Sequence, residues 1–201
     1  MKLYDFELSG NCYKIRLILS LLGLSYERQT VDLANGEQTG EAFLKLNSKG
    51  EVPVLQDGEQ CFSDSNAILV YLATKYAPEH YLPQDPETLA LIQYWLSTAA
   101  NEIHHGVAAA RVVKLFGLPR DYDNAIIIGT NLLLQLDEFL STHQWLATDK
   151  ITIADIAIYP YVALAEDGGI SVESYSHIQQ WFKRIESLPG YTPLPTVAVT
   201  A

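Results

Sequence analysis

The first 77 residues alternate between the two-residue hydrophobic period of β-strands and the longer period of helices. Lys2 to Phe6 and Ser25 to Val31 predict strands. Asn11 to Leu22 carries apolar residues at helical spacing, and Gly23 is a typical helix stop. Two strands joined by a helix form a βαβ unit, which pairs its strands in parallel through a right-handed crossover.

The pattern then changes to that of an antiparallel hairpin. Val52 to Leu55 and Gln60 to Phe62 predict two strands, and Asp57-Gly58 between them is a strong turn signal. Glu41 to Leu46, ahead of the hairpin, predicts one or two helical turns.

A third helix follows the hairpin. It is predicted over Asn66 to Tyr76, with Ser63 or Asp64 as its N-cap. The order of elements is therefore β-α-β-α-β-β-α. A parallel pair followed by a hairpin, with helices on its faces, is the thioredoxin-like α/β arrangement.

The second half of the chain lacks strand patterns. Ala77 to Pro86 holds three prolines without periodicity and predicts a linker. Long helical patterns then cover Glu87 to Leu115, Asp121 to Leu140, Thr152 to Leu164 and Val172 to Leu188, before an extended tail. We therefore predict a thioredoxin-like domain over 1–78, a linker over 79–86 and an all-α C-terminal domain over 87–201.

Charge and composition exclude several classes of protein. The net charge of −11 disfavours phosphate backbones and anionic lipid, so we expect no nucleic acid or membrane partner. No apolar run reaches the roughly 20 residues that span a bilayer. The N-terminus has no signal-peptide pattern, and Cys12 and Cys61 are too few for a disulfide scaffold or a zinc site. We expect a cytoplasmic protein without a metal.

The turn between the first strand and the first helix is the leading candidate for chemistry. A helix N-terminus there presents unpaired N–H groups and stabilises an anion, including a thiolate. Ser9 could donate its hydroxyl to a sulfur, and Cys12 completes a Ser-x-x-Cys sequence. Alternatively, Ser9 is only an N-cap and Cys12 only a small buried residue.

Two further segments would reach the same edge of the sheet. The proline of Val52-Pro53 is typically cis in thioredoxin-like domains, and Val52 would offer its peptide groups to an extended peptide. Asp64 and Ser65, at a helix start, could hold an α-amino and an α-carboxylate group. Each also has a structural reading, as an edge-strand proline and as a capping pair.

Taken in order, four segments resemble the bacterial cytosolic glutathione transferase family along the whole chain. They are Ser-Gly-Asn-Cys-Tyr-Lys from Ser9, Asn-Ser-Lys-Gly-Glu-Val-Pro-Val-Leu from Asn47, Ser-Asp-Ser-Asn-Ala-Ile-Leu-Val-Tyr-Leu from Ser63, and Ile-Thr-Ile-Ala-Asp from Ile151. The last also fits a capping box by itself, in which Thr152 caps a helix and Asp155 reaches back.

The resemblance implies a role for each matching residue toward glutathione, the co-substrate. Ser9 would stabilise the thiolate, with Asn11 and Cys12 as alternative groups within reach of the same turn. Val52, beside Pro53, would pair with the cysteinyl backbone, and Asp64 and Ser65 would bind the γ-glutamyl end. Gln38 and Lys49 flank the expected position of the glycyl carboxylate.

The first long helix of the C-terminal half is expected to supply the wall of an electrophile site. Its candidates are His104, His105, Ala108, Arg111 and Phe116. His104 and His105 are neighbours whose side chains should point apart, which offers no metal site. Ala108 and Arg111 should share a helical face with His104.

The resemblance implies a detoxifying transferase that conjugates glutathione to a hydrophobic electrophile or reduces a peroxide. One alternative is a glutathione-dependent thiol transferase that uses Cys12 as its nucleophile. Another is a non-catalytic module that binds glutathione or a partner. The resemblance also implies a homodimer.

Overall fold

The computed structural model describes residues 1–77 and 79–195. By their contacts, the described residues divide into a first unit, residues 1–77 with 189–195, and a second unit, residues 79–188. The parts of the predicted linker and tail that fall on Pro78 and on 196–201 lie outside the described residues.

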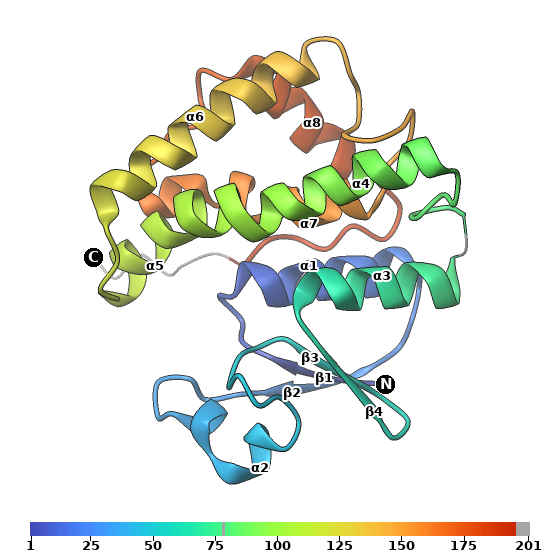
Figure 1. Cartoon of the computed structure of the whole chain (residues 1–201), viewed down its shortest axis with the longest axis vertical. Helices are drawn as coiled ribbons and strands as arrows, with labels where there is room; N and C mark the ends of the chain where they lie inside the picture. Colours follow the sequence, from blue (N-terminus) through green and yellow to red (C-terminus); the bar gives the residue numbers. More distant parts are fainter. Residues whose placement is uncertain (78, 196–201) are drawn as a thin grey trace. The chain divides into compact units, whose positions relative to one another are not determined.

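The first unit is built on one mixed, four-stranded sheet (Figure 1). Its strands are β1 (Lys2–Asp5), β2 (Glu27–Thr30), β3 (Val54–Asp57) and β4 (Gln60–Ser63). They lie in the order β2-β1-β3-β4; β1 and β2 are parallel, and the other two pairs are antiparallel. The predicted βαβ unit and hairpin are confirmed.

The helices of the first unit are α1 (Gly10–Leu21), α2 (Glu41–Leu44) and α3 (Ser65–Tyr76), with a short 3₁₀ turn η1 (Glu37–Thr39). Residues paired across strands share a face of the sheet. Tyr4 and Val54 form one such pair, and Phe43 of α2 packs against both. Leu3 and Leu55 point to the opposite face, over which α1 and α3 lie side by side in Figure 1.

The tail belongs to the first unit, whereas the sequence led us to assign it to the helical domain. The Tyr13 hydroxyl of α1 donates to the carbonyl of Thr192. Gly190 has a φ of 87°, and a Cβ there would lie 2.8 Å from the Ser20 carbonyl oxygen. Glycine therefore permits both the left-handed turn and the close approach to α1.

The second unit has no β-strand among its described residues, 79–188. Its elements are α4 (Pro86–Thr98), the π-helix η2 (Ala99–Ala108), α5 (Ala109–Phe116), α6 (Tyr122–Leu140), α7 (Ile153–Ala163), the 3₁₀ turn η3 (Ala165–Gly168) and α8 (Ser176–Glu186). The first three form the continuous green rod of Figure 1. The sequence predicted this rod as one helix but did not reveal its π-helical middle.

The π-helix packs very closely on α6. A Cβ on Gly106 would lie 2.7 Å from the backbone nitrogen of Gly129, which no side chain tolerates. Two glycines that face each other therefore set the distance between η2 and α6.

The segment predicted as a linker instead packs within the helical unit. Tyr81 and Leu82 are buried, and the Tyr81 carbonyl accepts a hydrogen bond from the Ile153 N–H at 3.0 Å. The prolines of this segment stop helix formation, but its apolar side chains still bury against the start of α7.

The predicted capping box of α7 is confirmed. The Thr152 hydroxyl accepts from the Ala154 N–H at 3.2 Å, and the Asp155 carboxylate accepts from the Thr152 N–H at 2.9 Å. Both side chains are fully buried, so this cap is part of the core.

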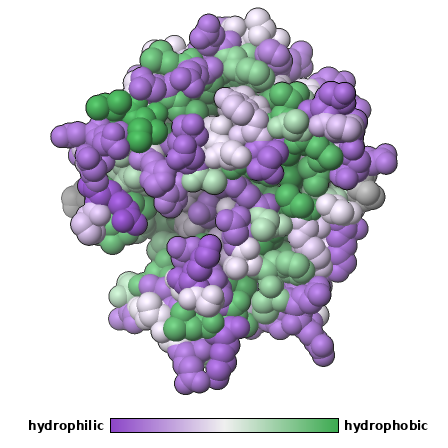
Figure 2. Space-filling model, viewed as in Figure 1, coloured by the Kyte–Doolittle hydropathy of each residue, from purple (hydrophilic) through white to green (hydrophobic). Residues whose placement is uncertain are grey.

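The visible surface carries hydrophilic residues over much of its area, with apolar residues among them (Figure 2). Within residues 1–77 and 79–195, no helix has the length and apolar character needed to cross a bilayer.

Candidate functional site

Strand register brings the predicted site segments of the first unit to one edge of the sheet. Tyr4 pairs with Val54, and Val54 pairs with Ser63. The turn after β1, the residues before β3 and the residues after β4 therefore emerge together. These are the segments that hold Ser9, Val52-Pro53 and Asp64-Ser65, so their predicted convergence is borne out by the pairing.

Ser9 is the N-cap of α1. Its backbone is extended, with φ −77° and ψ 120°, and its Oγ accepts from the Cys12 N–H at 3.2 Å. A hydroxyl accepts and donates at once, so the capping bond leaves the proton of Ser9 available for a donor role. The cap and the predicted thiolate contact are compatible.

A buried ion pair fixes the turn that leads to Ser9. The Asp5 carboxylate is fully buried, and its Oδ1 lies 2.6 Å from Nη1 of Arg16 in α1. Arg16 also donates through Nη2 to the Glu7 carbonyl at 2.8 Å. The sequence alone did not predict this ion pair, although an arginine among the apolar residues of a helix is a detectable signal for a buried partner.

The structure argues against Cys12 as the reactive group. Its side chain is fully buried, and its sulfur accepts from the Phe6 N–H at 3.4 Å. Burial raises the pKa of the Cys12 thiol to about 12, so the thiolate is scarce at neutral pH. The helix start predicted an activated thiol, but the side chain points into the core beneath the turn.

The peptide bond between Val52 and Pro53 is cis, as the thioredoxin-like arrangement predicted. Among the described residues, the peptide groups of Val52 have no recorded hydrogen-bond partner. The preceding loop is held by Asn47, which is buried and donates to the Glu51 carbonyl at 2.7 Å. Val52 can therefore pair with an extended peptide without giving up a bond to the protein.

Asp64 caps α3 through one carboxylate oxygen, which accepts from the N–H groups of Asn66 at 2.9 Å and Ala67 at 3.0 Å. Its φ of 71° is unusual for a residue with a side chain. Asp64 is exposed, whereas Ser65 is buried. The Ser65 hydroxyl donates to the Asn11 side-chain oxygen at 3.2 Å, which joins the starts of α3 and α1.

The 3₁₀ turn η1, which holds Gln38, lies against the loop that carries Lys49. A Cβ on Gly50 would lie 3.0 Å from the Gln38 carbonyl oxygen, and the φ of Gly50 is +64°. The Gln38 side-chain oxygen is buried without a hydrogen-bond partner among the described residues, while Lys49 is exposed. Both residues stay predicted contacts for the glycyl carboxylate.

Two of the predicted electrophile-wall residues lie inside the helical unit. Ala108 is buried, and the buried Arg111 forms an ion pair with Asp167 at 2.8 Å. His104 is exposed, so the three residues differ in burial, and the face that they were expected to share stays a prediction. Arg111 instead ties α5 to η3.

His104, His105 and Phe116 are exposed. The rings of the two histidines do not point apart as predicted but meet edge to face, with centroids 4.9 Å apart. In the described part of the chain, no group of three or more histidine, cysteine or acidic side chains could hold a metal ion.

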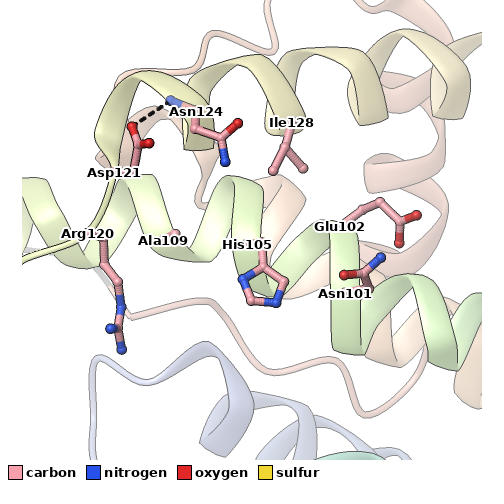
Figure 3. A pocket seen from close by; sticks show the side chains of 8 residues that line it. All are labelled: Asn101, Glu102, His105, Ala109, Arg120, Asp121, Asn124 and Ile128. Carbon is pink, nitrogen blue, oxygen red and sulfur yellow. Dashed lines mark hydrogen bonds between the residues drawn. The ribbon is translucent and has the colours of Figure 1, made fainter.

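A pocket of about 310 Å³ lies within the helical unit (Figure 3). It is lined by side chains of η2, α5 and the start of α6: Asn101, Glu102, His105, Ala109, Arg120, Asp121, Asn124 and Ile128. His105 is the only predicted wall residue among them. Six of the eight lining residues are polar or charged.

Comparisons with known proteins agree with this architecture. Residues 3–80 match the N-terminal domain of glutathione S-transferases, and residues 120–189 match the C-terminal domain. Glutathione S-transferase 3 of Zea mays is 30% identical over 95% of this chain and 91% of its own length. Glutathione S-transferase theta-1 of Mus musculus is 27% identical over 94% of this chain and 84% of its own length.

Solved structures extend the likeness to the fold. The glutathione S-transferase from Pseudomonas fluorescens superposes with a TM-score of 0.89 at 37% identity, over 97% of this chain and 98% of its own. A possible glutathione transferase from Rhodopseudomonas palustris gives 0.87 at 27% identity, over 98% of both chains. The two domains, in this order and over this length, show that the chain belongs to the glutathione S-transferase family, a family of transferases.

Proposed function

We propose that this protein conjugates glutathione to an electrophilic carbon. The glutathione thiol releases its proton to solvent, and the thiolate sulfur forms a bond to carbon. The leaving group departs with the electron pair of the bond that breaks. The observation that carries this proposal is the strand register, which brings Ser9, Val52-Pro53 and Asp64-Ser65 to one edge of the sheet.

In this proposal each segment holds a different part of the tripeptide. The Ser9 hydroxyl and the N-terminus of α1 stabilise the thiolate. Val52 pairs with the cysteinyl backbone through its peptide groups, and Asp64 with Ser65 receives the γ-glutamyl end. The amide of Gln38 or the ammonium of Lys49 binds the glycyl carboxylate. Orientation of the thiolate toward the acceptor supplies the remaining acceleration.

The test is steady-state conjugation of glutathione to a chlorodinitrobenzene, in which chloride leaves. We expect Ser9→Ala to lower kcat/KM about 100-fold, the usual size for loss of one donor to a developing anion. We expect Cys12→Ala to keep the wild-type rate, because its thiol is buried. Ser25→Ala, a change at an exposed serine of the same unit, is the matched control.

Other outcomes would redirect the assignment. A rate lost only in Cys12→Ala would move the chemistry to that thiol. A wild-type protein that binds glutathione but turns over neither this acceptor nor an organic hydroperoxide would be a binding module. In the peroxidase assay, two glutathione molecules are oxidised to the disulfide while the hydroperoxide is reduced to an alcohol and water.

We also propose that the protein is a cytoplasmic homodimer and that side chains of the helical unit, His105 included, bind the electrophile. Light scattering on the purified protein tests the dimer. His105→Ala tests the second point, because loss of an electrophile contact raises KM for the electrophile and leaves KM for glutathione unchanged.

A further inference from the structure

Lys14 is a lysine of α1 that lies almost entirely inside the first unit, with 2% of its surface exposed. Its ammonium donates to the Ser65 hydroxyl oxygen at 3.4 Å. The same hydroxyl donates to the Asn11 side-chain oxygen at 3.2 Å. One chain of polar groups therefore runs from Lys14 through Ser65 to Asn11, behind the start of α3.

Burying an ammonium group costs free energy, so a buried lysine needs hydrogen bonds or charged neighbours that compensate this cost. Burial lowers the pKa of Lys14 to about 8, and the negative charge of Asp64 opposes this shift. The group is consequently protonated in most molecules at neutral pH. The site thus combines the exposed carboxylate of Asp64 with the buried positive charge of Lys14, which contacts Ser65.

This arrangement matches an amino acid that carries both charges on one carbon. The α-amino group of such a ligand would bind the carboxylate of Asp64, and its α-carboxylate would accept from the Ser65 hydroxyl. Lys14 donates to the oxygen of that hydroxyl. The hydrogen bond from Lys14 occupies a lone pair of Ser65 Oγ, so the hydroxyl proton is directed away from Lys14 and toward an acceptor. In the protein without ligand, that acceptor is Asn11.

We propose that Lys14 is a positioning residue that makes this site specific for the α-carboxylate of the γ-glutamyl group, acting through Ser65. The inference rests on the proposed function. In this proposal, Lys14 determines how much more tightly the site binds a γ-glutamyl group that has its α-carboxylate than one that lacks it. On binding, the Ser65 hydroxyl exchanges its bond to Asn11 for a bond to the ligand carboxylate.

The test compares two ligands by isothermal titration calorimetry. One is glutathione, and the other is the same tripeptide with 4-aminobutyrate in place of the γ-glutamyl residue, which keeps the amino group and lacks only the α-carboxylate. We expect Lys14→Met to raise Kd for glutathione at least tenfold and to leave Kd for the analogue unchanged. Lys14→Arg, which keeps the charge, should restore part of the glutathione affinity.

Two further variants separate this role from a structural one. Lys45→Met, at the exposed lysine that follows α2, is the matched control and should bind glutathione like the wild type. Ser65→Ala and Lys14→Met should be non-additive, because the lysine acts through the serine. If Lys14→Met does not fold, Lys14→Gln replaces it in the same comparison.

Equal loss of affinity for both ligands, or additive effects of the two substitutions, would overturn the proposal and leave the proposed function standing. A wild-type protein that does not bind glutathione would overturn both. A loss confined to the carboxylate-bearing ligand, with rescue by arginine, is the result expected.

Discussion

Asp155 and Asp64 both accept backbone N–H groups at the start of a helix, but they differ in burial and in helix position: Asp64 is the N-cap of α3, whereas Asp155 is the third residue of α7, after the N-cap Thr152. Asp155, at the start of α7, is fully buried. One of its oxygens accepts from the Leu146 N–H and the Trp181 indole, each at 3.0 Å, and the other accepts from the Thr152 N–H. Asp64, at the start of α3, is exposed and caps through a single oxygen.

The difference lies in how many of the carboxylate oxygens are already occupied by the protein. Both oxygens of Asp155 are occupied by groups of its own unit, so nothing is left to bind another molecule. Asp64 keeps one oxygen without a recorded partner and adopts a φ of 71°, a conformation that a residue with a side chain adopts at a cost. The two aspartates therefore differ in burial and in whether a carboxylate oxygen is left to bind another molecule.

The largest expected effect comes from removing the buried cap. Asp155→Ala leaves three N–H donors without an acceptor inside the helical unit, and each unsatisfied buried donor costs about 1–3 kcal/mol. We expect the free energy of unfolding to fall by about 3–5 kcal/mol, since the unit relaxes in part. Urea denaturation measures the loss. Asp149→Ala, at an exposed aspartate of the same unit, is the control, and equal losses in the two variants would contradict the assignment.

A pH titration sharpens the same comparison. The pKa of an aspartate is ordinarily 3.8, and burial raises the pKa of Asp155 to about 6 in the folded protein. The folded state therefore binds this proton more tightly than the unfolded state does. This contribution to stability is fully present below about pH 4 and is lost as the pH rises through 6. A shift of this size corresponds to about 3 kcal/mol. The stability difference between wild type and Asp155→Asn should shrink accordingly over that range, and parallel pH profiles would refute the assignment.

The smallest expected change in stability comes from Asp64→Gly. Glycine removes the capping oxygen at a cost of a few tenths of a kcal/mol and relieves the positive φ, so stability should change by less than about 1 kcal/mol. The affinity for glutathione should nevertheless fall about tenfold, because the carboxylate partner of the α-amino group is gone. Calorimetry and urea denaturation on one sample check both. Asp85→Gly, at the N-cap of α4, should lower stability without changing glutathione affinity.

The order of elements in the first unit was predictable because its signals are local. The strand and helix periods, the turn at Asp57-Gly58 and the prolines each act over a few residues. The convergence of Ser9, Val52 and Asp64 followed from the topology, since strand order determines which loops share an edge. The capping box at Thr152 was likewise predictable from the five residues Ile151 to Asp155.

What the sequence did not predict depends on packing. Cys12 occupies the expected position at a helix start, but only the core beneath the turn determines that its thiol points inward. The π-helix at Ala99–Ala108 changes which side chains share a face, and the close approach of Gly106 to Gly129 lies on two helices far apart in sequence. The roles of Arg16 and Lys14 likewise depend on partners from other segments.

The hydrogen bond between Tyr13 and Thr192 joins residues 179 positions apart. The first unit is therefore assembled from both ends of the chain, with the whole helical unit inserted between its two parts. During synthesis, β1 to α3 leave the ribosome early, but the segment that covers α1 emerges only after α8. The helical unit is contiguous in the chain and can complete its contacts first, so the unit that begins the sequence is the last to be finished.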